Sequence, residues 1–186
     1  MGMPSREDAI VDLFFSEPSK QWHFEEILTT SNVSRSKANK WLLKLMHEGI
    51  ITRKKPEGRM PYFQSNFDNP AYRNRKKLYA LLKLYRSGFL DHLAALPKAK
   101  TVIIFGSFSR ADWYTDSDID LFIYGSDEGL DIARFENVLH REIQVFSANT
   151  RKGLERIGTG LLRNIIEGMI VKGRLDFVQV TPNAAV

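Results

Sequence analysis

The sequence of 186 residues contains no cysteine, so it can form neither disulfide bonds nor thiolate metal sites. It has no apolar run approaching the ~20 residues that a membrane-spanning helix requires. Residues 1–8 lack the apolar stretch of a secretory signal peptide. The sequence shows neither an internal repeat nor a low-complexity tract. We therefore expect a cytoplasmic protein that has no membrane partner.

What the chain does contain is the composition of an ordinary globular protein, with 43% hydrophobic and 26% charged residues. Its length allows one large domain or two small ones. The formal net charge is +5, and the charges are unevenly distributed. Lysine and arginine concentrate within residues 35–86, whereas acidic residues gather within residues 112–131. This asymmetry predicts two modules with different roles, and the basic one is expected to meet a polyanion.

The most informative stretch is residues 101–124, TVIIFGSFSRADWYTDSDIDLFIY. A strand over residues 102–105 is expected to end at Gly106-Ser107, and a second strand carries Asp118 and Asp120 after a polar loop. Alternate residues of a strand point to one side, so the two carboxylates would lie about 6–7 Å apart and share divalent cations. The turn offers backbone N–H groups to a phosphate. The stretch therefore predicts a metal-dependent phosphoryl or nucleotidyl transfer site.

Taken singly, both parts of this pattern are weak signals. An Asp-x-Asp pair is usually a solvated strand end, and a Gly-Ser pair is usually only a turn. Their combination at a fixed spacing is far more specific, and FGSFSRADWYTDSDIDLFI resembles the signature of the DNA polymerase β-like nucleotidyltransferase superfamily. The likeness is greatest to the small "minimal" nucleotidyltransferases of bacteria and archaea. One departure is Ala111, where those proteins typically carry a glycine after the arginine.

This resemblance covers residues 100–186 and implies a Mg²⁺-dependent enzyme, with Mn²⁺ as the alternative ion. The enzyme would transfer NMP from an NTP, with ATP favoured, to an unidentified acceptor. The expected metal ligands and catalytic groups are Asp118, Asp120 and Glu142. The expected nucleotide-binding residues are Gly106, Ser107 and Arg110. Glu142 is the weakest of these assignments, because a strand-borne glutamate next to an arginine is also a routine exposed residue.

The rest of the C-terminal part predicts a small mixed sheet with helices on one side. A helix is expected to begin near residue 130, followed by a strand over residues 141–146. A further helix over residues 154–171 and a last edge strand over residues 177–180 complete the pattern. This is too little chain for separate thumb and fingers domains, so an acceptor would have to be positioned by another module, a second chain or a partner.

Residues 1–67 predict three short helices followed by a basic hairpin. The first helix is expected to begin with Ser5 as its N-cap, and the third to cover residues 35–48. Strands are expected over residues 50–54 and 62–66. This order is typical of a winged helix-turn-helix domain and resembles the winged-helix domains of prokaryotic transcription regulators.

The charges of this module favour contact with double-stranded DNA. A helix whose first turn carries small and basic side chains can enter the major groove, and a basic wing can meet the flanking phosphates. The expected DNA-binding residues are Arg35, Ser36, Lys37, Lys40, Arg53, Lys54, Lys55 and Arg59. The alternative is a protein-interaction or dimerisation module with solvated charges. Trp41 and Phe63 are expected in the core.

Residues 68–99 predict a long amphipathic helical connector, in which Gly88 marks a kink or a join between two helices. The basic run at residues 73–77 is expected to be a solvated face. Such helices are often docking or dimer surfaces, so a homodimer is one expected assembly. The predicted organisation is α+β: a winged helix-turn-helix domain (1–67), the connector (68–99) and a palm-like nucleotidyltransferase domain (100–186).

Two functions are compatible with this organisation. In the first, the protein is an active nucleotidyltransferase with an unidentified acceptor, for which a protein hydroxyl is one candidate; the families it resembles include antitoxins that AMP-modify a partner toxin. In the second, it is a DNA-binding transcription regulator whose nucleotidyltransferase-like domain binds nucleotide or mediates assembly without catalysis.

Overall fold

The structure is a computed structural model that describes residues 6–176. The chain divides into two compact units, residues 1–83 with 111–117, and residues 84–110 with 118–186. The expected N-cap Ser5 and the expected edge strand over residues 177–180 lie outside the described residues. Within them, no helix is both long enough and apolar enough to cross a membrane.

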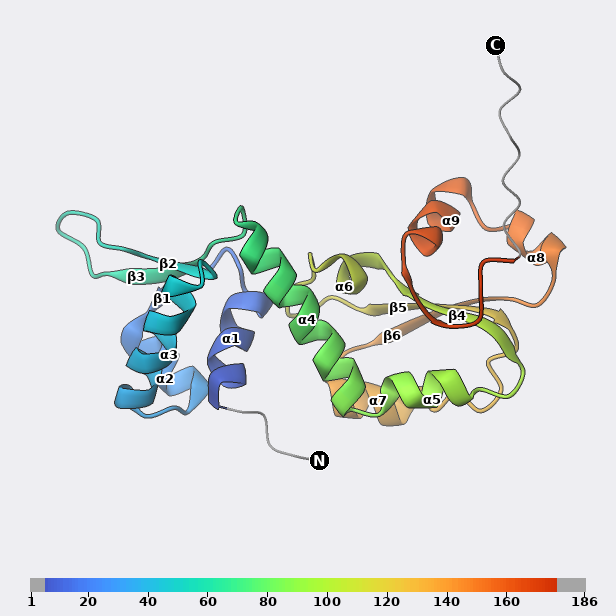
Figure 1. Cartoon of the computed structure of the whole chain (residues 1–186), viewed down its shortest axis with the longest axis horizontal. Helices are drawn as coiled ribbons and strands as arrows, with labels where there is room; N and C mark the ends of the chain where they lie inside the picture. Colours follow the sequence, from blue (N-terminus) through green and yellow to red (C-terminus); the bar gives the residue numbers. More distant parts are fainter. Residues whose placement is uncertain (1–5, 177–186) are drawn as a thin grey trace, which may run out of the picture. The chain divides into compact units, whose positions relative to one another are not determined.

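The described part of the first unit contains helices α1 (Arg6–Ser16), α2 (Phe24–Ser31) and α3 (Arg35–His47), most of helix α4 (Pro70–Arg86) and a small antiparallel sheet (Figure 1). The strands are β1 (Trp22–His23), β2 (Ile51–Lys54) and β3 (Tyr62–Ser65), in the order β1-β3-β2. The hairpin of β2 and β3 follows α3 directly in the chain, as the sequence predicts for a wing.

Apolar spacing explains how α3 packs. Ala38, Leu42 and Leu45 recur at helical spacing and are all buried. Phe63 of β3 is also buried, as expected. Trp41 is only half-buried, because it lies at the edge of this apolar stripe. The ammonium groups of Lys40 and Lys44 lie over its ring. The expectation that Trp41 is a core residue is therefore met only in part.

Gly88 separates two helices. Of the two alternatives that the sequence leaves open, a kink within one helix or a join between two, the structure shows the join. Helix α4 (Pro70–Arg86) ends before it and helix α5 (Phe89–Ala95) begins after it. Gly88 has φ +76°, a left-handed conformation that glycine adopts without steric cost and that a continuing helix does not allow.

Within its described residues, the second unit is built on a four-stranded sheet in the order β6-β5-β4-β7. Its strands are β4 (Ala99–Phe105), β5 (Ile119–Gly125), β6 (Ile143–Ala148) and β7 (Met169–Lys172). Strand β4 runs antiparallel to β5 and to β7, whereas β5 runs parallel to β6. The prediction of a small mixed sheet is confirmed.

Helices cover both faces of this sheet, so the expectation of helices on one side is wrong. On one face Ile103, Phe105 and Phe122 pack with Leu154 and Ile165, which belong to α8 (Arg151–Glu155) and α9 (Thr159–Ile166). Helices α5 and α7 (Ile132–Leu139) lie on the other side (Figure 1). The physical reason is visible in β4, where consecutive residues are buried and both faces therefore need cover.

The helix expected over residues 154–171 is also wrong. Gly158 separates α8 from α9, and the segment after Gly168 forms β7. A Cβ atom at residue 168 would lie 2.6 Å from Cγ2 of Ile103 and 2.7 Å from the carbonyl oxygen of Ile104. The chain therefore passes so close to β4 that only glycine fits, and Met169, Ile170 and Lys172, which follow, pair with that strand.

Candidate active site

The carboxylate of Asp120 lies against the backbone of Gly106. Strand β4 ends at Phe105, which pairs with Asp120 of β5, and the short helix α6 (Gly106–Arg110) begins at the next residue. Gly106 has φ +73°, and a Cβ atom there would lie 2.8 Å from Cγ of Asp120 and closer still to its Oδ2. Both the conformation and the contact require glycine. The structure thus brings together the two motifs that the sequence placed on neighbouring strands.

Three charged groups interact at this point. Burial raises the pKa of Asp120 above its ordinary value, the charge of Asp118 raises that pKa further, and Arg110 lowers it in part. Asp118 and Asp120 are both half-buried, whereas Arg110 is exposed. A half-buried carboxylate whose ionisation is disfavoured by burial and by a second carboxylate forms, together with that neighbour, a donor set suited to a divalent cation.

Helix α6 supplies the polar groups next to this pair. Ser107 is half-buried, and the hydroxyl of Ser109 donates a hydrogen bond to the carbonyl oxygen of Gly106 at 3.1 Å. That bond fixes the carbonyl of Gly106 within the helix. The sequence predicts a turn at Gly106-Ser107, and in the structure these two residues begin helix α6.

Glu142 precedes β6, and its side chain is exposed. Its carbonyl oxygen accepts a hydrogen bond from the N–H of Ile119 at 2.9 Å, so its main chain runs beside the start of β5. Over the described residues 6–176, no three histidine, aspartate or glutamate side chains gather closely enough to hold a metal ion. The role of Glu142 as a third ligand stays a prediction.

Sequence reasoning missed Gln144 as a neighbour of the carboxylates. The parallel pairing of β5 with β6 sets Gln144 beside Asp120, and paired residues of neighbouring strands point to the same face of a sheet. A neutral amide therefore occupies the position adjacent to Asp120 on the next strand. Glu142 and Gln144 are two residues apart, so the alternation of the strand predicts that both point to the same face. Only the register of β5 with β6 shows which of the two lies beside Asp120.

The segment that joins the two motifs, residues 111–117, packs within the first unit. Ala111 is buried and has φ +64°. The chain thus adopts, at the position of the departure from the family pattern, the left-handed conformation that a glycine would favour.

Lys76 is buried, which corrects the expectation that the whole basic run at residues 73–77 is solvated. Its ammonium group donates a hydrogen bond to the carbonyl oxygen of Trp113 at 2.6 Å. A tryptophan within an otherwise polar loop was the signal in the sequence that this loop is packed against something.

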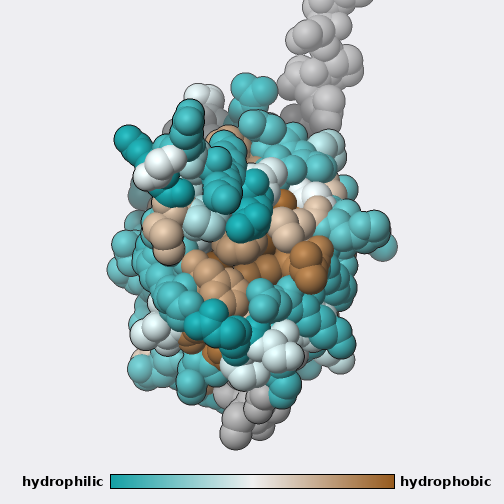
Figure 2. Space-filling model, turned by 90° about the vertical axis from the view of Figure 1, so that its left-hand side faces the viewer, coloured by the Kyte–Doolittle hydropathy of each residue, from teal (hydrophilic) through white to brown (hydrophobic). Residues whose placement is uncertain are grey.

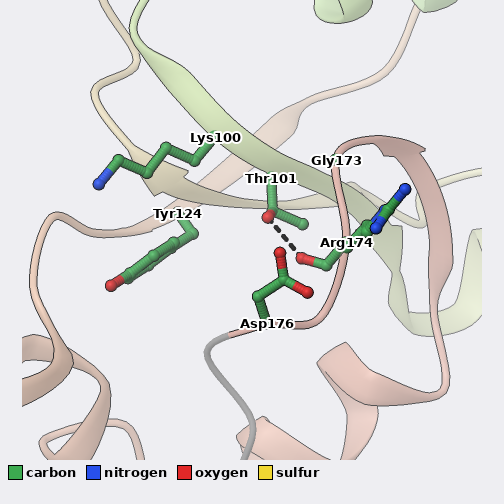
Figure 3. Close-up of a pocket in the computed structure, with 6 residues that line it drawn as sticks. All are labelled: Lys100, Thr101, Tyr124, Gly173, Arg174 and Asp176. Carbon is green, nitrogen blue, oxygen red and sulfur yellow. Dashed lines mark hydrogen bonds between the residues drawn. The ribbon is translucent and has the colours of Figure 1, made fainter.

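The pocket drawn in Figure 3 lies away from the carboxylates. It has a volume of about 410 Å³ and is lined by Lys100, Thr101, Tyr124, Gly173, Arg174 and Asp176. Thr101 pairs with Tyr124, whereas Phe105 pairs with Asp120. Four residues along a strand correspond to about 13 Å, so the pocket is at the opposite end of β4 and β5.

The expected DNA-binding side chains are all exposed on the first unit. They lie on α3 and on the hairpin, at Arg35, Ser36, Lys37, Lys40, Arg53, Lys54, Lys55 and Arg59. The first turn of α3 contains no acidic residue. Figure 2 shows hydrophilic side chains around a hydrophobic area on the face of this unit that it draws. The exposed apolar side chains of the unit include Leu43 and Met60.

Comparison with known proteins finds one family model that matches part of the chain. A family model described as "Polymerase beta, Nucleotidyltransferase" matches residues 91–171. This range contains Gly106, Ser107, Arg110, Asp118, Asp120 and Glu142. The match supports the DNA polymerase β-like nucleotidyltransferase superfamily, and with it a transferase that acts on a nucleotide. No curated protein matches the chain, and no solved structure matches it.

Proposed function

We propose that the protein is a Mg²⁺-dependent nucleotidyltransferase that transfers NMP from an NTP, with ATP favoured, and that its first unit binds DNA as a winged helix. The observation that carries the chemical part is the contact between the backbone of Gly106 and the carboxylate of Asp120, with the charge of Asp118 close by. The family match to the same residues supports the class of reaction. A protein hydroxyl, including that of a partner toxin, is the candidate acceptor.

The residues of the site would divide the work as follows. Asp118 and Asp120 would hold Mg²⁺, or Mn²⁺, together with the triphosphate. When bound, the metal stabilises charge on the attacking and leaving oxygens. Gly106 allows the phosphates to approach the main chain, and the Ser107 hydroxyl and N–H are donors for phosphate oxygens. The guanidinium of Arg110, which already interacts with Asp120, offsets triphosphate charge, and Glu142 would serve as a further ligand or as the base toward the acceptor hydroxyl.

The experiment that tests this assignment uses isosteric variants. Wild type, Asp118→Asn and Asp120→Asn are incubated with each α-³²P-labelled NTP and Mg²⁺, with and without cell extract. Asp116→Asn is the matched control, because this aspartate is exposed and belongs to the first unit, whereas Asp118 and Asp120 are half-buried in the second. We expect label to reach a macromolecule with wild type and with Asp116→Asn only. Undiminished transfer by both carboxylate variants would refute the assignment.

A second function, nucleotide binding without catalysis in a DNA-binding regulator, is favoured by a different observation. The two central carboxylates have no third acid grouped with them in the described part of the chain, and Gln144 lies beside Asp120. Mg²⁺-dependent ATP binding that is lost in Asp120→Asn, without any transfer of label, would select this function.

The DNA-binding part rests on the exposed basic side chains of α3 and the hairpin. Replacing Lys37 or Lys40 by alanine should weaken binding to duplex DNA. If the replaced lysine neutralises one phosphate, the slope of log affinity against log salt should also become shallower by about 1. Lys98→Ala, on the second unit, is the control. Absence of binding to any duplex at low salt would instead favour a protein-interaction module, which the hydrophobic area in Figure 2 would serve.

A further inference from the structure

A buried lysine holds the loop that joins the two halves of the candidate site. Lys76, on α4, is only 2% exposed. Its ammonium group donates a hydrogen bond to the carbonyl oxygen of Trp113 at 2.6 Å and lies 4.4 Å from the centre of the Trp113 ring. The rings of Tyr72 and Tyr114 have their centres 5.9 and 5.8 Å from it. The cation is thus surrounded by aromatic faces and bound to a main-chain oxygen.

The loop is fixed at further points in the same unit. The Trp113 ring stacks on Tyr79 of α4, and Phe15 of α1 meets both rings edge-on. The N–H and the hydroxyl of Thr115 donate hydrogen bonds to the carbonyl oxygen of Ser16, at 3.0 and 3.2 Å. Helices α1 and α4 therefore both hold residues 111–117.

Packing alone does not account for a lysine at position 76. An apolar side chain of similar length would fill the same space without the cost of removing an ammonium group from water. What only the ammonium supplies is a charged donor that fixes the Trp113 carbonyl and is stabilised by the surrounding rings. Peptide bonds join this loop to Arg110 at one end and to Asp118 at the other, so the loop's position bears on both ends of the candidate site.

We propose that Lys76 is a positioning residue that couples the two ligands of the protein. By fixing residues 111–117 to α1 and α4, it makes nucleotide binding at Asp118 and Asp120 and DNA binding by the first unit depend on each other. The inference rests on the proposed function, since it needs both ligands. Coupling between two sites is reciprocal, so nucleotide changes DNA affinity by the same factor as DNA changes nucleotide affinity.

The test measures this coupling factor in variants of the full chain. The probes are Mg²⁺-ATP, titrated by calorimetry, and a fluorescein-labelled mixed-sequence duplex of about 30 base pairs at low salt, followed by anisotropy. Lys76→Met keeps the length and burial of the side chain but removes the donor. Lys77→Met, at the exposed neighbouring position, is the matched control. Thr115→Val removes a bond to Ser16 at an exposed position and serves if Lys76→Met does not fold.

In wild type and in Lys77→Met, we expect saturating Mg²⁺-ATP to change the Kd for the duplex by about 5-fold or more. In Lys76→Met the change should fall below about 2-fold while each ligand still binds, and Thr115→Val should fall between the two. A purely structural lysine would lower the Tm and leave the coupling factor intact. That result, or a wild type that binds both ligands independently, overturns the inference and leaves the proposed function standing. Absence of ATP binding that depends on Asp120 overturns both.

Discussion

Replacing Asp120 by asparagine should stabilise the metal-free protein, because the native site holds two carboxylates near each other. Asp118 immediately precedes β5, which therefore carries only one of the two aspartates that the sequence assigned to it, and Asp120 is the second residue of the strand. Two residues of extended chain correspond to about 7 Å. At that separation two unit charges repel by about 0.6–2.4 kcal/mol for effective dielectric constants between roughly 80 and 20. The loss of the attraction to the exposed Arg110 offsets part of this. We therefore expect a net gain of about 1 kcal/mol at neutral pH, or about 2–4 °C in Tm.

The pH dependence of this gain follows from the raised pKa of Asp120. A raised pKa means that the protonated carboxyl favours the folded state. The stability that wild type has at acidic pH is therefore lost as the pH rises through that pKa. Asparagine cannot ionise, so its advantage over wild type should be present at neutral pH and disappear in acid.

Thermal unfolding with EDTA, followed by calorimetry at several pH values, measures the effect, and Asp116→Asn is the control expected to change the Tm little. Adding Mg²⁺-ATP should reverse the order, because only wild type would then gain stability from the ligand. An Asp120→Asn protein that is less stable than wild type at neutral pH without metal, or whose gain persists in acid, would refute this account of the site.

Three further substitutions test other parts of the structure. Gly106→Ala should lower the free energy of unfolding by clearly more than the about 1 kcal/mol expected for Gly88→Ala. Both glycines have a positive φ, but only at Gly106 would a Cβ atom meet another side chain, that of Asp120. Chemical denaturation measures both losses, and equal losses would contradict the contact. Ala111→Gly should stabilise the protein by up to about 1 kcal/mol by relieving the left-handed conformation, and an unchanged or lower denaturation midpoint would speak against it. Burial raises the pKa of Tyr72 to about 12. The free energy of unfolding should therefore fall by about 2–3 kcal/mol as the pH rises from about 10 to 12. Chemical denaturation across this range should show that Tyr72→Phe removes the loss, whereas Tyr85→Phe, at an exposed position, does not.

The features predictable from the sequence are those that local pattern determines. The alternation and spacing around Asp118 and Asp120 indicated two adjacent strands, and Gly88 indicated the join between α4 and α5. The prediction of a single helix over residues 154–171 is wrong, because the helical pattern ends at Gly158 and again before Gly168. Pairing with β4, which the local sequence does not show, determines the conformation of residues 169–172.

Features that depend on contacts between distant parts of the chain were not predictable in the same way. The sequence indicates that residues 73–77 are basic, but which of the lysines is buried depends on where Trp113 packs. Likewise, the choice between Glu142 and Gln144 as the neighbour of Asp120 depends on the register of β5 with β6, and a slip of two residues would preserve every pattern in the sequence.

The packing of residues 111–117 has a consequence for dissecting the protein. The second unit is discontinuous, since the chain leaves it after Arg110 and returns at Asp118. A fragment that begins at Leu84 would therefore retain Trp113 but lose α1 and most of α4, whose aromatic side chains pack on it, and would expose a large apolar ring in the segment between Arg110 and Asp118. The two units are consequently not interchangeable modules: grafting the transferase part onto another protein would require a new partner for this loop.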